Sequence, residues 1–336
     1  MESEKVIDVQ NLRISFKTED GRVPAVDGIT FHIKKGEILG VVGESGCGKS
    51  ITSLSLMKLV PEPPGIVEAD SMLFNEINLM NLSEKQMREI RGDDISMIFQ
   101  EPMTSLNPLF TIGSQLTEAI RIHRKWSKKQ AKERVLDMLK LVGLPRVEEL
   151  IKNYPHQLSG GMRQRIMIAM ALLCDPKLLI ADEPTTALDV TIQAQILQLM
   201  KELNEELNTA IMLITHDLGV VAEVCDRVMV MYAGKIIEET DVLTLFKNPK
   251  HPYTRGLIKS VPDKRIKKDR LYSIPGNVPK PGSIKQGCHF ASRCEFVTER
   301  CLIETPPIYH LKNYHKVRCF LHEEEGVRDE QSIATS

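Results

Sequence analysis

The chain has 336 residues, enough for a large hydrophobic core and for two domains. Its formal net charge is −1 and 26% of its residues are charged, so it lacks the basic excess typical of nucleic-acid-binding proteins. No apolar run approaches the roughly 20 residues needed to span a bilayer, and the acidic N-terminus MESEKVIDV lacks the apolar core of a signal peptide. We therefore expect no nucleic-acid partner, and we expect any membrane role to run through partner proteins.

Residues 6–60 read as strands around a glycine-rich loop. A strand-like run at residues 38–42 precedes GESGCGKS at residues 43–50, which fits the phosphate-binding pattern G-x-x-x-x-G-K-S, and a helix-like apolar stretch follows. Glycines in such a loop let backbone N–H groups close around phosphate at the helix N-terminus. Lys49 is expected to reach the β- and γ-phosphates, and the Ser50 hydroxyl to bind Mg²⁺. The residues predicted to contact nucleotide here are Gly43, Glu44, Ser45, Gly46, Cys47, Gly48, Lys49 and Ser50.

The next part of the chain changes from strands to helices. Residues 75–100 predict turns, a short polar helix and a strand at residues 95–99 that ends at Gln100. From residue 101 to about 173 the pattern is helical, and residues 127–142 carry a one-sided apolar stripe. Ser127 is a plausible N-cap for this helix and Gly143 a stop signal. These residues predict a block of helices inserted between strands.

Acidic and histidine side chains follow two later strands. Residues 177–181 form an apolar run that delivers Asp182 and Glu183 at its C-terminal end, where ligands gather in an open α/β sheet. Asp182 is placed to hold Mg²⁺, directly or through water, and Glu183 to polarise an attacking water. His216 follows a second strand-like run at residues 210–215, and strands alternate with helices as far as Tyr232. This alternation predicts a mainly parallel sheet.

A further motif, LSGGM at residues 158–162, lies between Gln100 and Asp182 in the chain and is followed by Arg163 and Gln164. Ser159 and the amides after it open a helix whose partial positive charge suits an anion. The order of these motifs resembles that of the ATP-binding cassette (ABC) ATPases. The resemblance implies that Ser159, Gly160 and Gly161 contact the γ-phosphate of an ATP held by a partner subunit's phosphate loop.

The same resemblance implies roles for several other residues. Gln100 matches a glutamine that senses Mg²⁺ and leads toward a membrane partner, and His216 matches a histidine thought to contact the γ-phosphate and orient the catalytic glutamate. Phe16 is a candidate for stacking on adenine, with ordinary strand packing as the alternative. Ala187, Leu188 and Asp189 resemble the D-loop that crosses the dimer interface. The implied catalytic residues are Glu183, His216 and Gln100, and the implied Mg²⁺ ligands are Ser50, Gln100 and Asp182.

The resemblance also implies a fold and an assembly. We expect an α/β P-loop NTPase: a RecA-like core with a mainly parallel sheet, an antiparallel β subdomain and a helical subdomain at about residues 101–173. The predicted ATPase domain covers residues 1–262, and a small cysteine-containing extension covers residues 263–336. Because ATP sites in the family lie between two cassettes and this chain carries one set of motifs, we expect a dimer. A heterodimer with a related chain is the prediction, and self-pairing is left open.

Beyond Gly234, frequent prolines are expected to break regular structure. The segments NPKHPYTRGLIKSVP, IPGNVP and GCHFASRC, with QEPMTSLNP after Gln100, resemble the oligopeptide/dipeptide importer ATPases. This narrower resemblance implies peptide uptake driven by ATP and Mg²⁺ at the cytoplasmic face of the cell membrane. The implied partners are two permeases and, through them, an extracytoplasmic solute-binding protein. Import of nickel or another small solute is the alternative, and a soluble non-transport ABC ATPase is a further one.

Four of the seven cysteines crowd into the last fifth of the chain: Cys288, Cys294, Cys301 and Cys319. Four thiolates suit a [4Fe–4S] cluster, and some members of the importer family carry one in this extension. Zinc and plain reduced thiols are the alternatives, since a four-cysteine site serves both metals. We expect the segment to be folded largely by its metal, because its apolar residues are scattered.

Overall fold

The computed structural model describes residues 4–19, 21–100, 105–186, 188–261 and 272–328. Two compact units can be separated within it. The first unit contains Met1–Ile7, Ile33–Ile38 and Phe74–Leu213, and the second contains Asp8–His32, Leu39–Leu73 and Ile214–Ser336. None of the helices among the described residues is both long and apolar enough to cross a membrane.

A twisted antiparallel sheet forms one part of the second unit. Its long strands β1 (Lys5–Thr18) and β2 (Gly21–Lys34) are neighbours, and β5 (Ser71–Phe74) flanks β1. The short strand β4 (Gly65–Glu68) also pairs with β1, antiparallel. Ile7 and Val9, and then Leu12 and Ile14, are buried with the period of two residues typical of a strand, and the period is interrupted at Asn11, which has φ +51°.

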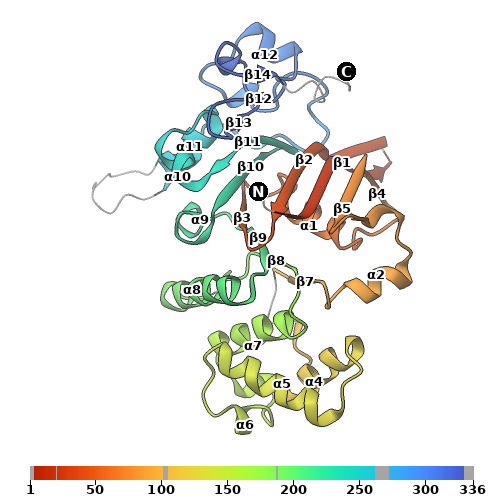
Figure 1. The fold of residues 1–336 in the computed structure, drawn as a ribbon. Helices are drawn as coiled ribbons and strands as arrows, with labels where there is room; N and C mark the ends of the chain where they lie inside the picture. Colours follow the sequence, from red (N-terminus) through yellow and green to blue (C-terminus); the bar gives the residue numbers. More distant parts are fainter. Residues whose placement is uncertain (1–3, 20, 101–104, 187, 262–271, 329–336) are drawn as a thin grey trace. The chain divides into compact units, whose positions relative to one another are not determined.

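The second unit also contains strands around the phosphate loop. The strand order is β14-β12-β13-β11-β10-β3, in which β10 (Arg227–Tyr232) runs parallel to β3 (Ile38–Val42) and antiparallel to β11 (Lys235–Asp241). All five residues of β3 are buried, as expected for a strand covered on both faces. Helix α1 (Lys49–Leu56) follows β3 and helix α9 (Leu218–Val224) precedes β10, and Figure 1 shows α9 beside β10 and α10 (Val242–Lys247).

In the first unit, strands β9 (Ala210–Ile214), β8 (Leu178–Asp182) and β7 (Ile95–Ile98) are neighbours in that order, and β7 is parallel to β8. Before them come β6 (Ile77–Asn78), the 3₁₀ turn η1 (Leu79–Asn81) and the polar helix α2 (Glu84–Ile90). The predicted turns, short helix and strand of residues 75–100 are therefore confirmed.

The predicted block of helices lies in the first unit (yellow to green in Figure 1). It contains α4 (Ile112–His123), α5 (Lys128–Leu141), α6 (Val147–Leu150), the 3₁₀ turn η2 (Pro155–Gln157) and α7 (Gly160–Leu172), and α8 (Val190–Leu207) follows β8. Ser127 caps α5 as predicted, because its hydroxyl accepts a hydrogen bond from the Gln130 amide. Gly143, just past the helix, has φ +73°, a left-handed conformation that glycine adopts without strain. Residues 101–104 of the predicted block lie outside the described residues.

The expectation of broken structure beyond Gly234 is wrong for the residues that follow it. Strand β11 begins at Lys235, and helices α10 (Val242–Lys247) and α11 (Pro252–Ser260) come next. Pro252 does not interrupt α11 because it lies in the first turn, where the missing N–H has no helical partner to lose.

The last described residues form short helices and three short strands, and the strands share a sheet with β11. These elements are η3 (Ala291–Arg293), α12 (Glu299–Ile303), β12 (Tyr309–His310), β13 (Lys316–Val317), η4 (Phe320–His322) and β14 (Val327–Arg328). Strand β13 pairs antiparallel with β11. Phe290, Tyr309 and Val317 are buried. Phe290 packs against Tyr232 of β10 and Tyr253 of α11, whereas Phe296 is exposed, so the packing of this segment includes residues outside it.

Candidate functional site

The phosphate loop connects β3 to α1, as the sequence predicts. Gly48 caps α1 with φ +108°, and a Cβ at this position would lie 2.9 Å from the Ala25 carbonyl oxygen. A side chain would therefore be both strained and obstructed. The loop ends at the N-terminus of α1, a position that favours an anion.

Lys49 is the first residue of α1, and its side chain folds back over the loop. The Nζ atom donates hydrogen bonds to the carbonyl oxygens of Gly43 (2.6 Å) and Glu44 (3.1 Å), and the residue is 7% exposed. Cys47 is fully buried beneath it, and burial raises the pKa of this thiol. The Lys49 ammonium is thus held among loop carbonyls, where a phosphate bound in the loop would meet it.

The carboxyl end of β8 carries two acidic residues with different surroundings. Asp182 is the last residue of the strand and is 4% exposed. Glu183 follows with φ +48°, a backbone conformation that residues other than glycine rarely adopt. Its Oε2 accepts hydrogen bonds from Gln100 Nε2 (3.2 Å) and from the Thr186 hydroxyl (3.0 Å). The carboxylate of Glu183 is therefore oriented by two donors, one of them the predicted Gln100.

The LSGGM motif forms the start of α7. Ser159 is the N-cap, and its hydroxyl accepts a hydrogen bond from the Met162 amide at 3.3 Å. Gly161 lies in the first turn, where an added Cβ would be 3.0 Å from a methyl group of Ile192 in α8. Asp189 caps α8 by accepting a hydrogen bond from the Ile192 amide at 2.9 Å. The LSGGM residues 158–162, called the signature motif below, and Asp189 thus lie at the starts of two packed helices.

Four free cysteines line one small cavity in the second unit. Cys288, Cys294, Cys301 and Cys319 surround a volume of about 100 Å³ together with aromatic residues that include Phe290 and Phe320. Burial raises the pKa of Cys288 to about 11 and that of Cys319 to about 12, and neighbouring thiols of the group add to both shifts. Within the described ranges, no group of three or more His, Cys, Asp or Glu side chains is arranged to hold a metal ion.

Comparison with known proteins identifies the family. A model described as "ABC transporter" matches residues 26–186, and one described as "Oligopeptide/dipeptide transporter, C-terminal region" matches residues 237–301. The chain is 52% identical over 321 residues to the oligopeptide transport ATP-binding protein AppD of Bacillus subtilis, covering 96% of this chain and 98% of AppD. The chain belongs to the ABC transporter ATP-binding proteins.

A second relative and a solved structure agree with the family assignment. Identity to the dipeptide transport ATP-binding protein DppD of Bacillus subtilis is 53% over 323 residues, covering 96% of each chain. The dimeric cassette MJ0796 bound to ADP and Pi matches with a TM-score of 0.62 and 28% identity, covering 70% of this chain and 98% of that one. These findings confirm the predicted ABC cassette fold and make the chain an ATPase that binds ATP and Mg²⁺.

The predicted residues of this ABC protein are distributed over both units. The first unit holds Gln100, Asp182, Glu183 and the signature motif, and among these the structure joins Gln100 to Glu183. The second unit holds the phosphate loop, Phe16 and His216. Their nucleotide roles remain predictions.

Three of the predicted positions have particular surroundings. His216 is exposed and follows β9, as predicted. Phe16 is half-buried and lies opposite Gly65 of β4, so both adenine stacking and strand packing stay open. Leu188 and Asp189 of the predicted D-loop are described, whereas Ala187 lies outside the described residues.

Two side chains to which the sequence assigned no role hold the loop after β8. Gln164 of α7 is buried, and its Nε2 donates a hydrogen bond to the Pro184 carbonyl oxygen at 2.5 Å. Thr186 supplies the second donor to Glu183. The available signal was a polar residue, Gln164, on the helix face that carries Met167 and Ile168 three and four positions later.

Proposed function

We propose that this chain hydrolyses ATP to drive the uptake of di- or oligopeptides through an ABC importer at the cytoplasmic face of the cell membrane. One observation carries the proposal: residues 237–301 match the C-terminal region of oligopeptide/dipeptide transporters, in addition to the general ABC match at residues 26–186. The match at residues 237–301 distinguishes this chain from ABC ATPases that have other functions. The relatives AppD and DppD, whose names specify oligopeptide and dipeptide transport, support the same substrate class.

The described side chains suit the proposed chemistry. Lys49 supplies a cation to the β- and γ-phosphates, and the Ser50 hydroxyl and the Asp182 carboxylate are oxygen ligands of the kind that Mg²⁺ prefers. Glu183 would take a proton from the attacking water, since its carboxylate is already oriented by Gln100 and Thr186. We propose that His216, which follows β9, contacts the γ-phosphate.

The proposed assembly contains two cassettes, two permeases and a solute-binding protein. This chain offers one phosphate loop and one LSGGM motif. A signature motif that serves the nucleotide of a partner subunit requires a second cassette, and we propose a related chain rather than a second copy.

Transport measured in liposomes tests the proposed function. The chain would be assembled with the two permeases and the second cassette, and uptake of labelled short peptides would be followed with the binding protein outside and MgATP inside. We expect ATP-dependent peptide uptake that is lost with Lys49→Ala. Uptake of nickel without peptide uptake would favour the alternative solute. Full ATPase activity without the permeases, and with no uptake of either solute, would favour a non-transport ATPase.

We further propose a [4Fe–4S] cluster held by Cys288, Cys294, Cys301 and Cys319. The four thiols fit such a group because they line one cavity and none is in a disulfide. Zinc is the alternative occupant, since a four-cysteine site serves both metals. The cluster would cross-link the short helices, strands and loops of residues 288–319.

Anaerobic purification tests the metal. We expect a brown protein with about four iron and four sulfide per chain, and loss of the colour in Cys301→Ser. Cys174→Ser is the matched control, because this thiol is buried but does not line the cavity. A colourless protein with stoichiometric zinc would replace iron by zinc, and four freely titrating thiols without metal would end the proposal.

A further inference from the structure

An arginine of the C-terminal segment makes an ion pair with the phosphate loop. Arg293 Nη1 lies 2.7 Å from Glu44 Oε2, and Nη2 lies 3.1 Å from Glu44 Oε1. The Arg293 side chain is 3% exposed and that of Glu44 is 29% exposed. The contact is thus a two-bond, largely buried pair, a geometry that is more specific than an exposed surface ion pair.

Arg293 is itself fixed by further acceptors. Its Nε donates a hydrogen bond to the Pro275 carbonyl oxygen (2.9 Å), and Nη2 donates one to the Ile274 carbonyl oxygen (3.3 Å). Nη1 also donates to the Tyr232 hydroxyl at 3.3 Å. Because the guanidinium is planar and its donors point in fixed directions, these bonds determine where the Glu44 carboxylate must lie.

Glu44 is held by its backbone as well. Its N–H donates a hydrogen bond to the Tyr253 hydroxyl at 2.9 Å. Tyr253 is fully buried, and its ring centroid lies 4.7 Å from that of Tyr232 and 5.5 Å from that of Phe290. Phe290 also lines the four-cysteine cavity. The aromatic cluster of Tyr232, Tyr253 and Phe290 therefore connects the C-terminal segment to the loop.

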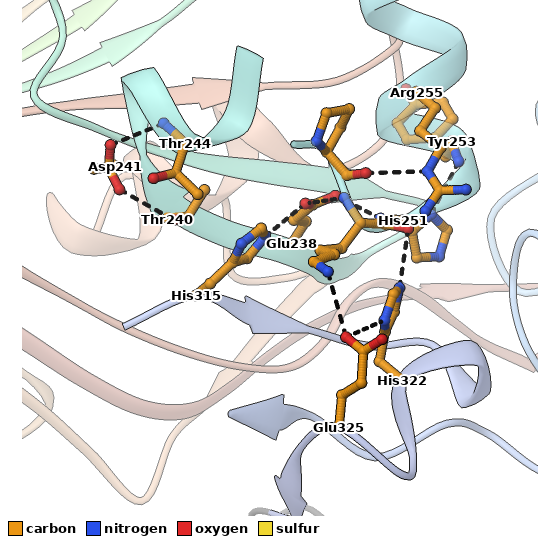
Figure 2. Close-up of polar contacts among 12 residues, drawn as sticks. Glu238, Thr240, Asp241, Thr244, His251, Tyr253, Arg255, His315, His322 and Glu325 are labelled. Atoms are coloured by element: carbon orange, nitrogen blue, oxygen red, sulfur yellow. Dashed lines mark hydrogen bonds and ion pairs between the residues drawn. The ribbon is translucent and has the colours of Figure 1, made fainter. Parts of the chain in front are cut away.

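The start of α11, which carries Tyr253, is anchored by a buried carboxylate (Figure 2). Glu238 of β11 accepts hydrogen bonds from the amides of Lys250 (2.7 Å) and His251 (2.8 Å), and His315 Nε2 lies 2.7 Å from it. The His251 Nδ1 atom then accepts a hydrogen bond from the Tyr253 amide at 3.0 Å. These contacts leave Tyr253 little freedom to move away from Glu44.

We propose that Arg293 and Tyr253 are positioning residues for the phosphate loop, so that the C-terminal segment sets the affinity for ATP. A phosphate loop binds through backbone N–H groups whose positions must be correct before the anion arrives, and ordering a loop costs conformational entropy. Two fixed groups on Glu44 remove part of this cost in advance. The proposal goes beyond the transport function and requires neither the peptide substrate nor the metal.

Equilibrium binding of MgATP to the full chain, measured by calorimetry, tests the proposal. We expect Arg293→Ala to raise Kd roughly tenfold, equivalent to about 1.4 kcal/mol. Tyr253→Phe, which removes only the hydroxyl, should raise Kd about threefold. Arg300→Ala is the matched control. Arg300 is another paired arginine of the C-terminal segment, but its partners Glu304 and Glu323 lie outside the phosphate loop. This variant should leave Kd within about twofold of the native value.

A double-mutant cycle separates positioning from general stability. If Arg293 acts through Glu44, then Arg293→Ala combined with Glu44→Ala should bind MgATP no more weakly than the worse single variant. Arg293→Lys, which keeps the charge but loses the two-bond geometry, should give an intermediate Kd. An unchanged Kd in folded Arg293→Ala, or fully additive effects with Glu44→Ala, would overturn the proposal. If Arg293→Ala does not fold, an unchanged Kd in Arg293→Lys and Tyr253→Phe would overturn it equally.

Discussion

Glu183 has an unfavourable backbone conformation that its neighbours maintain, and this conformation positions its carboxylate. Its left-handed φ of +48° is uncommon for a side chain of this size, and such conformations persist where the surroundings over-determine them. Here Gln100 and Thr186 bond the carboxylate, and Gln164 bonds the carbonyl oxygen of the next residue. The carboxylate is therefore positioned before any substrate binds.

Replacing Glu183 by Gln tests its role at the scale of one atom. The amide keeps the size of the side chain but cannot accept a proton, so we expect ATP binding to persist and hydrolysis to slow roughly 10²- to 10⁴-fold. Single-turnover hydrolysis and MgATP binding would be measured in the assembled transporter. Lys49→Ala should show the opposite division, with binding lost first. Near-normal turnover by Glu183→Gln would remove this residue from the catalytic role.

At the scale of elements, two serine-capped helices of the first unit offer a matched comparison. Ser159 caps α7 and Ser127 caps α5, and each hydroxyl accepts a backbone N–H. Ser→Ala at either position should destabilise the protein by about 1 kcal/mol. Only Ser159→Ala should also lower the maximal ATPase rate, because only α7 is proposed to face a nucleotide. Equal ATPase activity in the two variants at matched stability would contradict that role.

The start of α11 predicts a pH dependence of stability. Burial lowers the pKa of His251 to about 4, although the nearby Glu238 carboxylate opposes this shift. The unfolded chain binds a proton on this residue below about pH 6.5 and the folded chain only below about pH 4, so stability falls as the pH decreases between these values. The expected loss is at most about 3 kcal/mol.

Unfolding by denaturant at pH 7 and at pH 5 measures this loss. In His251→Asn, the side-chain oxygen can still accept a hydrogen bond from the Tyr253 amide, but residue 251 no longer titrates. The difference in unfolding free energy between pH 7 and pH 5 should therefore shrink. His156→Gln is the control, since this histidine is exposed in the first unit. The prediction fails if both variants retain the native pH dependence.

At the scale of the whole molecule, the chain carries one phosphate loop and one signature motif. We expect hydrolysis to require two cassettes. In the proposed heterodimer, Ser159→Ala should reduce nucleotide trapping at the partner's phosphate loop more than at the loop that contains Lys49. Photolabelling with an ATP analogue, followed by separation of the two cassettes, resolves the sites. Equal loss at both sites would indicate a symmetric homodimer or strong coupling between them.

The sequence alone was sufficient for features that depend on neighbouring residues. The strand Ile38–Val42, the glycine-rich loop, the Ser127 cap and the acidic pair at the carboxyl end of β8 were all predicted correctly. Burial pattern, capping and backbone freedom are properties of a few consecutive residues, so they can be read locally. The family's motifs are likewise local, and they led directly to the ABC resemblance.

Only the tertiary structure decided which distant side chains meet. Gln100 and Glu183 are 83 positions apart, and Glu44 and Arg293 are 249 positions apart. The composition beyond Gly234 indicated irregular structure, but the proline-free residues 235–241 pair with neighbouring strands as β11, and the first turn of α11 accommodates Pro252. Long-range hydrogen bonds and burial depend on the fold rather than on spacing in the chain. The connection between the C-terminal segment and the phosphate loop therefore had no signal in the sequence.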